Sequence, residues 1–248
     1  MPFALIRTAL LATAVIAPAA AQNPPPAAAI VRTVIAGTKL PDFSAAPVYF
    51  CALEVTIPAG AASRITEAPN GILYQLAGST EISTDGQQKT LAADEGLFIA
   101  GGHDASLKAG GGSPSHILHF LLMPGVTLGK PVETEPAAVA ELYRTPAPIP
   151  DLKAGTYELN LTRVTFPPGM PSNPPHHRSG AALYYILSGT GANTVAGVTA
   201  AKGPASLIYE PSSLVHQWGN PGAEPLTFLA FNINPEGTPA VVMESAAK

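Results

Sequence analysis

Residues 174–189 read PPHHRSGAALYYILSG, and residues 211–220 read PSSLVHQWGN. In each stretch, histidine and a run of apolar or aromatic residues lie between turn-forming residues such as Pro, Gly and Asn. Short runs bounded in this way are typical of β-strands. Because alternate residues of a strand face the same side, His176 and Arg178 would point one way and His177 the other.

The spacing of these residues resembles the two sequence motifs of the cupin family, small β-barrels that hold a metal or a small ligand inside. The first motif runs His, any residue, His, three or four residues, Glu, six residues and Gly, and its positions fall here on His176, Arg178, Ala182 and Gly189. The second runs Pro, any residue, Gly, two residues, His, three residues and Asn, and its positions fall on Pro211, Ser213, His216 and Asn220. Arg178 and Ala182 thus replace two of the four usual metal ligands, the second His and the Glu.

The first half of the chain repeats the second. Tyr74 and Gly78 correspond to Tyr185 and Gly189 at an offset of 111 residues, while VTIPAG at 55–60 matches VTFPPG at 164–169 at an offset of 109. The difference of two residues falls in the loop before His176. A repeat of about a hundred residues has the size of a domain. The chain is therefore predicted to be a duplicated barrel, which the resemblance identifies as a bicupin.

The composition supports an all-β fold. The 248 residues include 27 Pro and 23 Gly, spread along the chain, and 46% are hydrophobic. Strand-like runs from Val48–Ile57 to His116–Met123 follow one another between turns, as in a sandwich or barrel. We expect two tandem antiparallel β-barrels of the double-stranded β-helix or jelly-roll type, joined by a short helical linker.

The expected parts follow in order along the chain. They are a signal peptide (1–21), a tether and arm (22–45) that includes a short strand at 30–35, a degenerate barrel (46–130), a linker helix (131–150), a barrel with a partial motif (151–237) and a C-terminal tail (238–248). The linker helix is predicted from the helix formers of Ala137–Arg144, which follow Pro136 and end at a proline cluster. The signal is predicted from Arg7, a short apolar run and three alanines before Gln22.

A periplasmic or secreted protein without a membrane span after signal cleavage is therefore expected. Loss of Arg7 with the signal leaves 12 basic residues against 17 acidic ones, a net charge of −5. This weakly acidic balance argues against nucleic acid as a partner. The expected partner is a small molecule, and a homo-oligomer is left open.

The cavity of the second barrel is the predicted site, with His176, Arg178, Tyr184, His216 and Trp218 as ligand-binding residues. Arg178 keeps its charge and offers a planar fork of donors for a carboxylate or phosphate, but it repels a divalent cation. For Arg178 the alternative is a place at the barrel mouth facing solvent, and for the two aromatic rings it is ordinary core packing. The cofactor is expected to be none, or a divalent metal held weakly by His176 and His216, with His177 in place of His176 if the loop shifts by one residue.

The first copy lacks recognisable site residues. The offset places Ile65, Glu67 and Gly71 at the first-motif positions and Ala105 at that of His216, so this barrel is predicted to be a structural partner. Two functions compete for the second barrel: binding of a small polar or anionic organic ligand beside a degenerate metal site, and a metal-dependent enzyme of the oxygenase or isomerase type. Fold alone does not choose between them.

Overall fold

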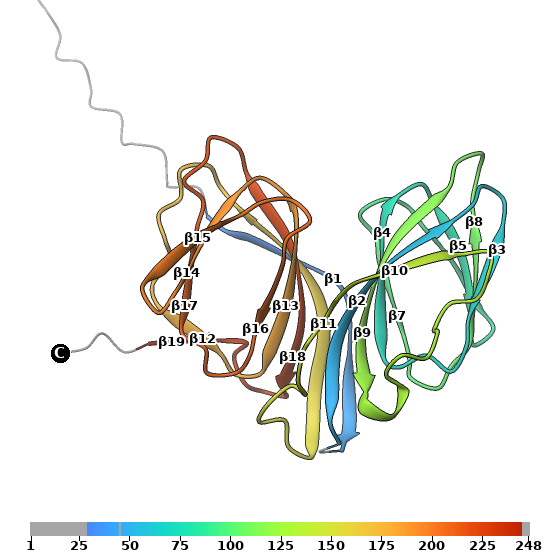
Figure 1. Cartoon of the computed structure of the whole chain (residues 1–248), viewed down its shortest axis with the longest axis horizontal. Helices are drawn as coiled ribbons and strands as arrows, with labels where there is room; N and C mark the ends of the chain where they lie inside the picture. Colours follow the sequence, from blue (N-terminus) through green and yellow to red (C-terminus); the bar gives the residue numbers. More distant parts are fainter. Residues whose placement is uncertain (1–28, 45, 245–248) are drawn as a thin grey trace, which may run out of the picture.

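The computed structural model describes residues 29–44 and 46–244, so the predicted signal at 1–21 lies outside the described residues. Over these residues the chain forms 19 strands and one short 3₁₀ helix, Gly125–Thr127. None of the described helices is long or apolar enough to cross a membrane. Figure 1 shows two β-barrels side by side, built from the first and second halves of the chain. The all-β prediction with two antiparallel barrels is confirmed.

The N-terminal barrel consists of two antiparallel sheets. One has the strand order β10, β2, β9, β4, β7, with the bounds Ala138–Arg144, Val48–Ile57, Ser115–Pro124, Gly71–Ala77 and Gly96–Ile99. The other has the order β3, β8, β5, β6, with the bounds Ala62–Ile65, Ala105–Ala109, Thr80–Thr84 and Gln87–Leu91.

The C-terminal barrel repeats this arrangement. Its first sheet has the order β1, β11, β18, β13, β16, with the bounds Val31–Phe43, Gly155–Phe166, Leu226–Pro235, Ala181–Ser188 and Leu207–Glu210. Its second sheet has the order β15, β14, β17, β12, β19, with the bounds Val198–Lys202, Gly191–Val195, His216–Gly219, His176–Arg178 and Val241–Met243.

The register of the strands follows the repeat of the sequence. Tyr74 pairs with Leu118 in the first barrel, and Tyr185 pairs with Leu229 in the second, so both partners shift by 111 residues. The glycine that ends the first motif is required in both copies. Gly78 and Gly189 have φ of 74° and 76°, and a Cβ at either would lie 2.4 Å from a proline carbonyl oxygen. Only glycine adopts this turn without a clash.

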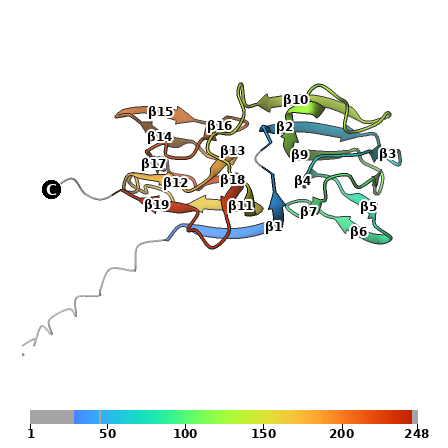
Figure 2. The same ribbon diagram turned by 90° about the horizontal axis from the view of Figure 1, so that it is seen from below.

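The two halves exchange their edge strands. β1 precedes the N-terminal barrel in sequence but pairs with β11 of the C-terminal barrel, and β10 pairs with β2 of the N-terminal barrel. Figure 2 shows each strand beside its partner. The strand expected at 30–35 is longer than predicted, since β1 runs from Val31 to Phe43. Because each exchanged strand extends a sheet of the other half, the exchange ties the halves together.

The prediction of a linker helix was wrong. Residues 138–144 form the edge strand β10, and the described residues contain no α-helix in this region. Leu142 and Tyr143 of this strand pack on the hydrophobic cluster between the barrels. The segment gains backbone pairing with β2 and this apolar contact at once, and such tertiary contacts override a weak helix propensity.

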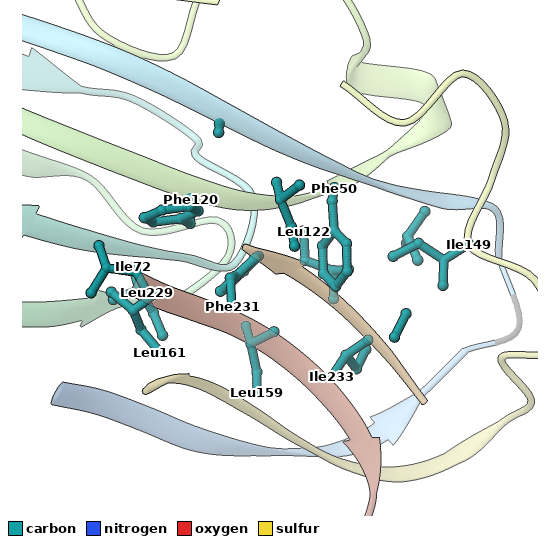
Figure 3. Close-up of a cluster of buried hydrophobic side chains, with 14 of the residues drawn as sticks. Phe50, Ile72, Phe120, Leu122, Ile149, Leu159, Leu161, Leu229, Phe231 and Ile233 are labelled. Carbon is teal, nitrogen blue, oxygen red and sulfur yellow. The ribbon is translucent and has the colours of Figure 1, made fainter. Parts of the chain in front are cut away.

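The barrels pack back to back through an interface core, the cluster drawn in Figure 3. Phe231 of the C-terminal barrel lies with its ring centroid 5.1 Å from that of Phe50 and 5.6 Å from that of Phe120, both of the N-terminal barrel. Two further clusters fill the barrel interiors. The N-terminal one is almost wholly aliphatic, including Ile65, Leu73 and Leu107, while the C-terminal one is smaller and aromatic, including Tyr184, Trp218 and Phe228.

Candidate functional site

The C-terminal barrel contains a cavity of about 340 Å³. Its apolar wall includes four aromatic residues, Phe166, Tyr184, Trp218 and Phe228. The tail strand β19 closes one side through Val241 and Met243, because it pairs with β12, the strand that carries the histidines. A concave, mainly apolar cavity of this volume is typical of small-molecule sites.

His176 and Arg178 line the cavity from the same face of β12. His177 faces the other way, and its Nδ1 lies 2.6 Å from Glu244 Oε1 near the molecular surface. Arg178 is only 9% exposed, and its Cζ lies 5.2 Å from the centroid of the Tyr184 ring, a cation–π contact. Arg178 thus belongs to the barrel interior and does not extend into solvent.

Glu210 supplies a buried carboxylate that the motif frame does not contain. It lies at the end of β16, directly opposite Ala182 in the pairing of β13 with β16. Its Oε1 accepts a hydrogen bond of 2.8 Å from Trp218 Nε1, and its Oε2 accepts one of 3.2 Å from Arg178 Nε. The carboxylate absent at Ala182 is therefore provided from the adjacent strand.

In the ion pair of Arg178 and Glu210, charge and burial have opposite effects on the pKa of each residue. Burial alone would raise the pKa of Glu210, but the nearby His216, the charge of Arg178 and the bond from Trp218 outweigh it and hold the pKa below its ordinary value. Burial lowers the pKa of Arg178, and Glu210 counteracts that effect. Each residue therefore keeps the other ionised inside the barrel. Losing one partner would leave an uncompensated buried charge.

The two motif histidines face each other across β12 and β17, where His176 pairs in register with His216. Their ring centroids are 4.3 Å apart. His176 Nδ1 donates to Pro174 O at 2.9 Å, and His216 Nδ1 donates to Leu214 O at 2.8 Å. In its neutral form, His176 therefore carries its lone pair on Nε2. Burial, with smaller contributions from His216 and Arg178, lowers the pKa of His176, which favours its neutral form.

His216 is fully buried and does not line the cavity. Its Nε2 lies 3.0 Å from Glu210 Oε2. The contact is not aligned as a hydrogen bond, and this nitrogen has no hydrogen-bond partner among the described residues.

A divalent metal fits these residues poorly as they stand. Over residues 29–44 and 46–244, no three His, Cys, Asp or Glu side chains have an arrangement that could hold a metal ion. Both oxygens of Glu210 already accept hydrogen bonds, and Arg178 places a positive charge at Oε2. A tight metal site needs three or four ligands without a competing cation.

Four of the five residues proposed from sequence for ligand binding line the cavity: His176, Arg178, Tyr184 and Trp218. His216 lies behind them, in contact with Glu210. Sequence reasoning missed Glu210, as well as Asn173, Asn160 and Asn232 in the lining. One signal for Glu210 was available, since it is the only Asp or Glu between positions 159 and 223.

The N-terminal barrel has apolar residues at the equivalent positions. Ile65 pairs with Ala105 where His176 pairs with His216, and both residues are buried. Its interior holds instead a fully buried pair, with His119 Nδ1 2.5 Å from Glu133 Oε1. These two residues pair with each other in an aliphatic core, which fits the structural role predicted for this barrel.

Comparison with known proteins places the fold. Residues 162–232 match the family described as "Cupin domain". The full sequence matches none of the curated proteins with which it was compared.

Solved structures are similar over most of the chain. They include oxalate decarboxylase from Lactobacillus farciminis in a formate complex, with 13% identity, a TM-score of 0.55 and coverage of 83% of this chain and 88% of that one. Salicylate 1,2-dioxygenase from Pseudaminobacter salicylatoxidans has 10% identity, a TM-score of 0.52 and coverage of 76% and 72%. A putative glyoxylate-induced protein from Pseudomonas aeruginosa has 12% identity, a TM-score of 0.51 and coverage of 74% and 73%. At these identities the likeness is one of fold alone.

Proposed function

We propose that this chain is a two-barrel member of the cupin superfamily, a bicupin, whose C-terminal barrel binds a small organic anion through Arg178 and His176. Glu210 and His216 would position these residues from behind without touching the ligand. Export to the periplasm or the exterior, expected from residues 1–21, is part of the same proposal.

The observation that carries the proposal is the state of the Arg178 guanidinium. It lines the cavity, yet its one hydrogen bond to the described residues uses Nε. The two terminal nitrogens, Nη1 and Nη2, therefore remain available to a ligand. A guanidinium held in place through Nε and stacked on Tyr184 presents its fork in a fixed orientation. Such a fork is suited to a carboxylate.

The other lining residues indicate what the rest of the ligand looks like. The aromatic wall around Trp218 and Phe228 favours an apolar body. Neutral His176, with its lone pair on Nε2, can accept a hydrogen bond from a ligand hydroxyl or amine. Arg32 of β1 also lines the cavity and is exposed, which adds positive charge at the entrance. We propose a compact carboxylate with an apolar or aromatic body as the ligand class.

The test uses Trp218, which lines the cavity and is the only tryptophan of the chain. Tag-free protein is titrated with benzoate and with its neutral analogue benzamide while tryptophan fluorescence is recorded. We expect benzoate to bind and benzamide to bind about 10 to 100 times more weakly, because bonds to a charged partner are the stronger ones.

Arg178→Gln should reduce benzoate binding to the level of benzamide, while Arg64→Gln, at an exposed position of the N-terminal barrel, should leave it unchanged. Equal binding of benzoate and benzamide to the unmodified protein, or undiminished benzoate binding to Arg178→Gln, would contradict the proposal.

A metal-dependent enzyme is the second candidate function. The observation that favours it is that His176 and His216 make the same kind of hydrogen bond, because the Nδ1 atom of each donates to a backbone carbonyl. This arrangement orients Nε2 in metal-binding histidines. Elemental analysis of tag-free protein decides between the two: one equivalent of Zn, Mn, Fe or Ni that is lost in His216→Ala would favour the enzyme.

A further inference from the structure

We infer that Asn232 forms a second polar subsite in the same cavity and accepts a hydrogen bond from a hydroxyl group of the ligand, which makes the ligand a hydroxycarboxylate with an apolar body. This inference rests on the proposed anion site at Arg178 and narrows the ligand class of that site. Asn232 is then a residue that determines specificity, because it selects a group of the ligand other than the carboxylate.

The side chains that face the barrel interior from the first sheet are arranged in levels. At one level, Asn160 of β11 is the register partner of Asn232 of β18. Asn232 pairs in turn with Ala182, and Ala182 pairs with Glu210, which holds Arg178. The backbones of Asn232 and Glu210 are therefore two strand spacings apart, about 10 Å. A ligand whose carboxylate binds Arg178 can reach Asn232 with a neighbouring group.

The amide oxygen of Asn232 has no partner. The Nδ2 atom donates to Ala230 O at 2.8 Å and to Asn160 Oδ1 at 2.9 Å. Because a backbone carbonyl only accepts hydrogen bonds, the contact with Ala230 fixes which end of the amide is the nitrogen. Asn232 lines the cavity and is 5% exposed, and its Oδ1 lacks a hydrogen-bond partner among the residues that the structure describes. A buried acceptor without a partner is costly, so a ligand donor that reaches it is favoured.

Asn160 positions this amide from the neighbouring strand. Its Oδ1 accepts the bond from Asn232 and a second bond of 3.0 Å from Thr162 Oγ1. Since the amide nitrogen of Asn232 is held toward β11, the amide oxygen is turned away from β11. The register partner of Asn232 on its other flank is Ala182, whose methyl group offers no hydrogen bond. The oxygen is thus left for a group that these neighbouring side chains do not supply.

The charges of the cavity favour a hydroxyl over an ammonium group as the donor. Arg178 and Arg32 both line the cavity, and two positive charges disfavour a third. The apolar body of the ligand has a separate place, because Phe228 lines the cavity farther along the same face of β18. The carboxylate and the hydroxyl would therefore lie together at the polar level, with the apolar body beside Phe228.

The experiment compares four ligands that differ from one another by single groups. They are mandelate, phenylacetate, which lacks the hydroxyl, and the neutral amides of both acids, mandelamide and phenylacetamide. Tag-free protein is titrated with each ligand while the fluorescence of Trp218 is recorded, and the two hydroxylated ligands are used as separate enantiomers.

The same titrations are made with Asn232→Leu, which keeps a branched side chain and removes the amide. The smaller Asn232→Ala is measured beside it, so that the test stands if leucine does not fit. Asn234→Leu is the matched control, because Asn234 is also buried on β18 with an unpartnered Oδ1 among the described residues but does not line the cavity.

The better enantiomer of mandelate should bind about 3 to 10 times more tightly than phenylacetate, which is the range expected for one neutral hydrogen bond. Mandelamide should exceed phenylacetamide by a similar factor, because the hydroxyl contact does not need the carboxylate. In Asn232→Leu and Asn232→Ala both preferences should disappear, while binding of phenylacetate remains. Asn234→Leu should keep both preferences.

The inference is overturned if mandelate binds no more tightly than phenylacetate to the unmodified protein. It is also overturned if the hydroxyl preference survives in the Asn232 variants or is lost in Asn234→Leu. Failure of the anion site gives a different result, since the two acids would then bind no more tightly than their amides, and the hydroxyl preference between the amides would still test Asn232. Absence of binding by all four ligands would contradict both the anion site and the hydroxyl subsite.

Discussion

Glu210 links Arg178 and Trp218, which line the cavity, with His216, which lies behind them. A buried carboxylate is stable only when it is paired and hydrogen-bonded. Here one side chain orients the guanidinium that we propose to bind the ligand, fixes the indole of the cavity wall and lies beside a motif histidine. Its contribution should therefore be visible in both stability and pH dependence.

Glu210→Gln should lower the free energy of unfolding at neutral pH by about 3–5 kcal/mol, because it leaves the charge of Arg178 buried and unpaired. The difference should depend on pH. The pKa of Glu210 in the folded protein is below its ordinary value of 4.5, so its contribution is complete above about pH 4.5 and is lost as the pH falls through the folded value.

The measurement is urea unfolding of both chains between neutral and acidic pH, with Glu224→Gln, at an exposed position, as the matched control. The gap between the unmodified protein and Glu210→Gln should narrow below about pH 4.5. A gap that keeps its size at acidic pH would show that the charge of Glu210 is not what stabilises the fold.

At the scale of elements, the turn between β16 and β17 keeps the backbone conformation of a motif glycine although another residue occupies the position. Ser213 occupies the glycine position of the second motif and has a φ of 62°, and the equivalent Gly102 has a φ of 77°. A left-handed conformation costs a residue with a Cβ about 1–2 kcal/mol. The turn is kept because it brings His216 opposite His176 and lets Ser213 N bond to Arg178 O at 3.4 Å.

Ser213→Gly should therefore raise the free energy of unfolding by about 1 kcal/mol, or the melting temperature by about 2–4 °C. Gly102→Ser is the reciprocal change in the other barrel. No atom lies within 4 Å of a Cβ built there, so only the backbone strain should act and stability should fall by a similar amount. Thermal unfolding of both variants tests this, and opposite signs for the two changes are the required result.

The elements also show how far sequence reasoning extends. The duplicated barrel could be predicted, because the offset of 111 links residues such as Tyr74 and Tyr185 that occupy the same register position. The strand β10 could not, because Ala137–Arg144 has the composition of a helix and becomes a strand through its pairing with β2. The local propensity of a segment gives no information on whether a distant strand has a free edge with which the segment can pair.

Part of the candidate site could also be predicted from the sequence, and part could not. Strand parity placed His176, Arg178 and Tyr184 toward the interior, where they line the cavity. The partnership of Glu210 with Ala182 depends on the register of β13 against β16, which the motifs do not specify. Residues 238–248 were expected to be a C-terminal tail outside the barrel. Val241–Met243 instead pair with β12 and close one side of the cavity.

At the scale of the molecule, the two barrels have diverged in their interiors while keeping one topology. The N-terminal barrel is filled by aliphatic residues and the His119–Glu133 pair. The C-terminal barrel keeps an aromatic cavity and the Arg178–Glu210 pair. The shared interface core and the exchanged strands β1 and β10 hold the barrels together. In this account, the first barrel supports the second, and the second binds an anion by means of a protein cation.

Benzoate binding before and after removal of metal tests this account most directly. Tag-free protein is treated with a chelator, checked by elemental analysis and titrated through the fluorescence of Trp218, and the titration is repeated with Zn²⁺, Mn²⁺, Fe²⁺ or Ni²⁺ added. We predict the same affinity for benzoate in every sample, because the positive charge that attracts the anion belongs to Arg178. Loss of binding in the chelated protein, with recovery when one of these ions is returned, would contradict the account.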